Sequence, residues 1–220
     1  MTSTFLQAGQ EIQKRKIALG FFIISFFYIL GSFTIGLVCS NANMCSFSSG
    51  LGRTPLNLLI VLLTFVPIWI GVWMAMKFVH RIPMSVLLGP SSKLDLQLLL
   101  RGFLAMLFLG IGIETTLQFI PAVSKYIYYE PNKLLFLSDW IKWLLPMILF
   151  IFVQSAAEEL VFRGYLLQII WSKSASYLYA VICPSLIFGL LHFDAQSYGA
   201  NAWYYCFNTF VVGCLLCLVT

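Results

Sequence analysis

Long apolar segments recur along this chain and are separated by short polar ones. About 20 consecutive apolar residues are enough to cross the hydrocarbon core of a bilayer as an α-helix. Six segments have this character, over residues 17–39, 55–76, 96–120, 140–171, 177–192 and 203–219. The pattern predicts an all-α, polytopic helical membrane protein with about six transmembrane helices.

The fourth segment is too long for one upright span. Its roughly 32 residues would reach about 48 Å as a helix, whereas the hydrocarbon core is about 30 Å thick. Proline can begin or kink a helix, so we predict a helix that begins near Pro146, with 140–145 at the membrane interface. The polar stretch 172–176 then predicts the turn of a helical hairpin.

Composition supports a membrane location. Hydrophobic residues make up 60% of the chain and charged residues 10%, against roughly 25% charged residues in soluble domains. The net charge of +5 does not indicate nucleic-acid binding, because the basic residues flank apolar runs and form no stripe. Their distribution predicts a cytoplasmic N-terminus. The small size and the lack of eukaryotic sorting signals favour a bacterial inner (plasma) membrane. His80, between Lys77 and Arg81, is typical of an interfacial anchor.

Ionisable residues inside these apolar segments carry the candidate chemistry. Glu158, Glu159 and Arg163 lie in the fourth segment, and His192 ends the fifth. Such residues are costly in a membrane and indicate function by default. Glu158 and His192 are equally far from Ala175 in the hairpin turn, at about 17 residues each. Antiparallel helices joined by a short turn place such residues at equal height, which predicts one shared site.

Helical spacing predicts different roles for the two glutamates. Glu159 and Arg163 are four residues apart and can form an ion pair, whereas Glu158 faces about 100° away. Glu158 is then free to act as a general base on water. Phe188 can pack beneath His192, which could bind water, stabilise an oxyanion or ligate a metal. Taken singly, the Glu159–Arg163 pair is more often structural and a lone histidine is usually a packing residue; together they favour a functional site.

The motifs Glu158-Glu159-x-x-x-Arg163 and Phe188-x-x-x-His192 resemble the signature of the CAAX protease and bacteriocin-processing (CPBP or Abi) family of intramembrane proteases. The chain has no low-complexity tract and no internal repeat, which favours a single membrane domain over 1–220. Within it the resemblance implies a partial catalytic core in 140–220, preceded by N-terminal spans in 1–139. It implies an endopeptidase in which Glu158, Glu159, Arg163 and His192 form the catalytic site. The implied partners are the lipid bilayer and a membrane-associated protein or peptide substrate. A divalent metal such as zinc is an open possibility, with Glu158 and His192 as its ligands.

One feature departs from this family. Its members carry a second histidine and an Asn or Asp beyond a glycine-containing helix, and no histidine follows His192 here. The chain therefore resembles a member truncated at the C-terminus, and we expect it to insert in a membrane but to lack proteolytic activity. The alternative interpretation is a non-catalytic membrane-binding or bacteriocin self-immunity protein of the same fold. A transporter or channel fragment whose buried charges line a pathway is a third.

Overall fold

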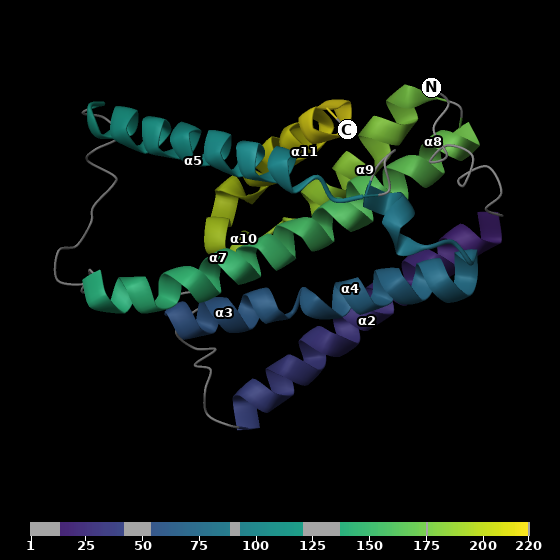
Figure 1. Cartoon of the computed structure of the whole chain (residues 1–220), viewed down its shortest axis with the longest axis horizontal. Helices are drawn as coiled ribbons and strands as arrows, with labels where there is room; N and C mark the ends of the chain where they lie inside the picture. Colours follow the sequence, from purple (N-terminus) through teal and green to yellow (C-terminus); the bar gives the residue numbers. More distant parts are fainter. Residues whose placement is uncertain (1–13, 42–53, 89–92, 121–136, 175, 220) are drawn as a thin grey trace. The chain divides into compact units, whose positions relative to one another are not determined.

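The computed structural model describes residues 14–41, 54–88, 93–120, 137–174 and 176–219 (Figure 1). Within these residues all regular structure is helical and there is no strand. The chain falls into two compact units, one of Met1–Ser92 with Pro146–Thr220 and the other of Lys93–Leu145. The single membrane domain over 1–220 stays a prediction.

The N-terminal helices of the first unit pack closely on one another. They are α2 (Lys14–Asn41), α3 (Pro55–Leu63), α4 (Val66–Met74), the π-helical η2 (Ala75–His80) and the 3-10 helix η3 (Met84–Leu88). Thr54 caps α3 by accepting a hydrogen bond of 3.2 Å from the backbone N–H of Asn57. Helix α2 contacts both α4 and η2. The close approach depends on Gly71, where a Cβ would lie 2.9 Å from the Cα of Ile24.

The C-terminal helices complete this unit. They are α7 (Leu137–Glu159), the π-helical η5 (Leu160–Leu167), α8 (Gln168–Ser174), α9 (Tyr177–Leu191), α10 (Ala195–Tyr198), the 3-10 helix η6 (Gly199–Asn201) and α11 (Ala202–Val219). Helix α9 folds back on η5 and α8, which confirms the predicted hairpin, and α11 packs on α9. Gly189 allows this second contact, because a Cβ there would lie 2.8 Å from the carbonyl oxygen of Cys206. Small residues commonly let membrane helices approach in this way.

The prediction of a helix start near Pro146 is wrong. Helix α7 begins at Leu137 and continues through Pro146. Membrane helices tolerate an internal proline because neighbouring groups can satisfy the backbone that it leaves free. The irregularity lies further along instead, where the helix becomes π-helical directly after Glu159.

The second unit contains α5 (Leu96–Gln118) and the first residues of α7, up to Leu145. The side chain of Asp95 caps α5 by accepting hydrogen bonds from the backbone N–H groups of Gln97 and Leu98, at 3.0 and 2.9 Å.

Five helices among the described residues are long and apolar enough to cross a membrane. They cover Lys16–Ser40, Pro55–His80, Leu96–Leu117, Ile141–Trp171 and Gly199–Leu218. The apolar helix Tyr177–Leu191 is shorter. This confirms a polytopic helical membrane protein with about six apolar helices. Cys39 and Cys45 flank a polar loop, and the sequence leaves open a disulfide between them. Cys45 lies outside the described residues.

The buried core of the first unit lies where the two sets of helices meet. Val72 and Ala75, from α4 and η2, are wholly buried, as is Ala157 of α7. Tyr165 and Phe188, from η5 and α9, belong to the same cluster. The glutamate pair therefore lies on an element that is fixed by packing.

Candidate active site

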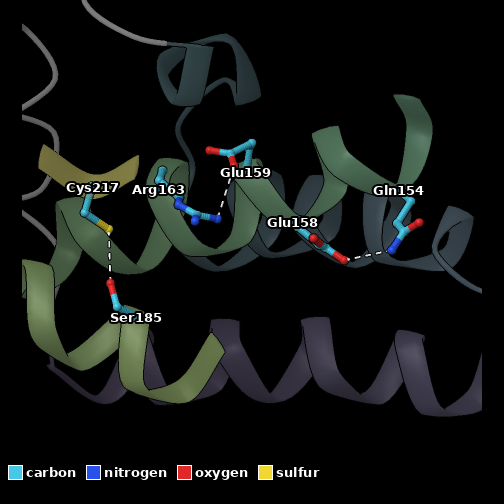
Figure 2. Close-up of polar contacts among 6 residues, drawn as sticks. All are labelled: Gln154, Glu158, Glu159, Arg163, Ser185 and Cys217. Carbon is cyan, nitrogen blue, oxygen red and sulfur yellow. Dashed lines mark hydrogen bonds and ion pairs between the residues drawn. The ribbon is translucent and has the colours of Figure 1, made fainter. Parts of the chain in front are cut away.

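The adjacent glutamates point to different sides of the helix (Figure 2). The Oε1 of Glu158 accepts a hydrogen bond of 3.1 Å from Nε2 of Gln154, one turn earlier. The Oε1 of Glu159 lies 3.1 Å from Nη1 of Arg163. The predicted ion pair is thus confirmed, and Glu158 lies outside it.

The two members of this ion pair differ sharply in exposure. Arg163 is 3% exposed, whereas Glu159 is 48% exposed. Arg163 belongs to η5, in which every residue from Leu160 to Leu167 is buried. Short π-helical segments within α-helices are frequent at functional sites, because they change which side chains face a neighbour. Here the segment carries a cation into the core.

The guanidinium of Arg163 also lies over an aromatic ring. Its Cζ is 4.8 Å from the ring centroid of Phe188 on α9, a position in which the ring attracts a cation. Among the described residues no acceptor makes a well-directed hydrogen bond to its three nitrogen atoms. Its charge is therefore compensated by the Glu159 ion pair and by the Phe188 ring.

The ring of His192 is oriented from two directions. His192 is the residue that caps the C-terminal end of α9, and its Nδ1 is 2.7 Å from the carbonyl oxygen of Phe188. A carbonyl can only accept, so Nδ1 carries the hydrogen and Nε2 is the nitrogen left for chemistry. The ring packs on Phe188 with centroids 4.5 Å apart, as predicted, and lies 6.3 Å from the ring of Tyr205 on α11.

Glu158 and His192 line one cavity of about 410 Å³. Gln154 lines it too, so that three polar groups from α7 and the end of α9 meet there. The other residues that line it are Phe21, Ile24, Ser25, Tyr28, Val61, Phe65, Ile68, Val161, Phe162, Phe188 and Leu191. Glu158 and His192 thus line the same cavity, as their spacing about the hairpin turn predicts, and that they form a catalytic site stays a prediction. Neither Glu159 nor Arg163 lines this cavity, so the structure places the four predicted residues in two adjoining groups.

Two contributors to the site were missed in the sequence. Gln154 could have been found, because it lies four residues before Glu158 and shares its helix face. Tyr28 could not, because nothing in the spacing of the chain connects α2 with α7. Its ring lies 5.9 Å from that of Phe65 on the cavity wall.

His80 is not the interfacial anchor that we predicted. It is 8% exposed, and its Nε2 shares a hydrogen bond of 2.8 Å with the hydroxyl of Tyr165. Tyr165 in turn donates to the backbone carbonyl of Ile17, at 3.3 Å. The π-helical turn η2 places His80 inside, where its bond to Tyr165 joins η2 to η5, the segment that directly follows the glutamates.

The described residues do not form a complete metal site. No group of three or more His, Cys, Asp or Glu side chains comes together among them. Catalytic zinc is ordinarily held by three protein ligands, and this cavity is lined by only two side chains of those types, Glu158 and His192. These residues alone do not fit a catalytic zinc ion.

Comparison with known proteins supports the sequence resemblance. Residues 140–220 match the family described as type II CAAX prenyl endopeptidase Rce1-like. Over 124 residues the chain is 32% identical to the uncharacterized protein YyaK of Bacillus subtilis (strain 168), which covers 56% of this chain and 40% of that relative. The chain thus matches about two fifths of the relative's length. No solved structure matches. The matched segment contains both motifs, and residues 140–220 of this integral multi-pass membrane protein are similar to the Rce1-like family of type II CAAX prenyl endopeptidases.

Proposed function

We propose that this chain is an intramembrane endopeptidase in which Glu158 activates the water that hydrolyses a peptide bond. The observation that carries the proposal is the shared cavity of Glu158 and His192, within helices apolar enough for a membrane. The family match at 140–220 supports the reaction class.

The arrangement supports a simple sequence of proton transfers. Glu158 takes a proton from a water molecule in the cavity while the water oxygen attacks the carbonyl carbon of the peptide bond. The carbonyl becomes an oxyanion, which Nε2 of His192 stabilises when it carries a proton. Glu158 then returns its proton to the leaving nitrogen as the C–N bond breaks. The products are a carboxylic acid and an amine, and transfer of the acid proton to the amine gives a carboxylate and an ammonium group.

Glu159 and Arg163 act on the site indirectly. Their ion pair lies outside the cavity, and Arg163 packs over Phe188, the same ring on which His192 rests. We assign the pair the role of holding η5 against α9, so that Glu158 and His192 stay opposed.

A comparison of two matched variants tests this proposal. Each would be reconstituted in liposomes with a quenched membrane peptide. We expect Glu158→Gln to lower the cleavage rate by a factor of about 10² or more, the usual contribution of a general base. Glu159→Gln makes the same chemical change one residue away and should retain measurable cleavage in the fraction that stays folded.

Two results would contradict the proposal. Near-normal cleavage by Glu158→Gln would exclude this residue as the base. Peptide binding without cleavage by the unaltered chain would agree with the inactivity expected from the missing second histidine and would favour the alternative, a non-catalytic membrane-binding protein of the same fold.

A further inference from the structure

We propose that one face of α2 forms a subsite for an uncharged apolar side chain of the peptide substrate, beside the bond that is cleaved. This inference rests on the proposed function. Helix α2 (Lys14–Asn41) lies outside the segment 140–220 that matches the family. It would therefore give this chain a substrate preference that is separate from its catalytic motifs.

The residues of α2 that line the cavity form a single helical stripe. Phe21, Ile24, Ser25 and Tyr28 are spaced i, i+3, i+4 and i+7, which places them on one face of an α-helix. The opposite face is exposed and apolar, with Phe26 49% and Leu30 46% exposed. One face of α2 is thus suited to lipid, while the other faces Glu158 across the cavity.

This wall is held in place by tight packing and by a buried hydrogen-bond network. A Cβ on Gly71 would lie 2.9 Å from Ile24, and one on Gly31 would overlap Pro67, so neither contact leaves room for α2 to move towards α4. Tyr165 binds the carbonyl of Ile17, one turn before Phe21, and is itself bound by His80. A wall fixed in this way can select side chains by size.

The chemistry of the cavity favours an apolar occupant. Its lining from η5 and from α9 is apolar and includes Val161, Phe162, Phe188 and Leu191. Ligand pockets of about 300–1,000 Å³ are typically apolar with a few placed polar groups, as this one is at about 410 Å³. An acidic side chain would be repelled by Glu158, and a basic one would pair with it and remove the free base. Ser25 is the smallest residue of the α2 stripe and leaves space for the substrate side chain.

Enlarging Ser25 tests the subsite by selectivity. We expect Ser25→Phe to change the kcat/KM ratio of small to large side chains by a factor of 10 or more, in favour of alanine, across a peptide series with Ala, Val, Leu or Phe next to the cleaved bond. Ala18→Phe is the matched control, because Ala18 is exposed on the same helix and does not line the cavity. It should keep the original preference. An unchanged preference in Ser25→Phe, with cleavage still dependent on Glu158, would overturn the subsite but leave the proposed function standing.

Photo-crosslinking tests the subsite without turnover. The photoreactive residue p-benzoylphenylalanine would be placed at position 25 or at position 18, in the Glu158→Gln background. We expect position 25, and not position 18, to capture a peptide with leucine in the series position. Capture that is equal at the two positions, or absent from position 25, would overturn the inference. Capture confined to position 25, together with no cleavage by the unaltered chain, would uphold the subsite while the proposed reaction fails.

Discussion

Glu158 and Glu159 are adjacent and chemically identical, but the rotation of about 100° between neighbouring helical residues places them in different surroundings. Glu158 is directed into the cavity and is bonded to Gln154, whereas Glu159 is directed away and pairs with Arg163. The proposed chemistry follows from that difference, because a base must be free to take a proton and a charge partner must not be.

Gln154 is the residue that we expect to position the Glu158 carboxylate. Gln154→Leu keeps a side chain of similar size but removes the 3.1 Å hydrogen bond to Oε1. We expect kcat to fall by about tenfold, the equivalent of one lost hydrogen bond to a charged group, with KM little changed. Steady-state kinetics on the quenched peptide measure both constants. Ser155→Ala, at an exposed position on the same turn, is the control. Equal kcat values in the two variants would show that Gln154 does not position the Glu158 carboxylate.

The Glu159–Arg163 pair should matter for stability in an asymmetric way. Glu159→Gln leaves a guanidinium that is 3% exposed without its ion-pair partner. We expect a loss of about 1–3 kcal/mol, since Glu159 is half exposed and solvent already screens part of its charge. Adding Arg163→Met should restore much of this loss, because the double variant buries no charge. Thermal unfolding in detergent measures the set, and strictly additive losses would show that the two side chains are not coupled.

Small residues bring helices α9 and α11 into close contact. Membrane helices gain little from burying apolar surface away from lipid, so close packing carries more of their association. Gly189 and Gly213 bring α9 against α11, and Ser185 lies 3.6 Å from Cys217 across the same contact (Figure 2). This contact fixes the end of α9, where His192 is located.

Gly189→Ala should disturb that contact. The added Cβ would lie 2.8 Å from the carbonyl oxygen of Cys206 and 2.9 Å from the side chain of Phe210. We expect a loss of about 1–3 kcal/mol in stability, as for overpacked sites generally. Gly36→Ala is the matched control, since a Cβ there meets nothing within 4 Å, and it should be neutral or mildly stabilising. Similar unfolding midpoints for the two variants would show that α9 and α11 are less tightly packed than described.

Much of the site could be predicted from the sequence because its parts are local. The equal spacing of Glu158 and His192 about one hairpin turn fixed their common height, and helical periodicity separated Glu158 from Glu159. The continuation of α7 through Pro146 and the inward position of His80 could not be predicted. Both depend on neighbouring helices, which satisfy a proline-interrupted backbone in one case and provide Tyr165 as a partner in the other.

The contribution of α2 to the cavity wall could not be predicted from the sequence either. Its stripe of Phe21, Ile24, Ser25 and Tyr28 is no more apolar than the lipid-facing side of the same helix, so only the packing against α4 identifies it. The cytoplasmic N-terminus and the bacterial inner membrane remain predictions, which rest on the distribution of basic residues and on the absence of sorting signals.

The central claim is that Glu158 and His192 act together on one water molecule and one peptide bond. A double-mutant cycle of Glu158→Gln and His192→Ala, measured as kcat/KM on the quenched membrane peptide, tests it most directly. Residues that act as a unit give strongly non-additive losses. We therefore expect the double variant to be about as slow as the slower single variant. Losses that multiply in full would contradict the claim, because they would show that the two side chains contribute independently.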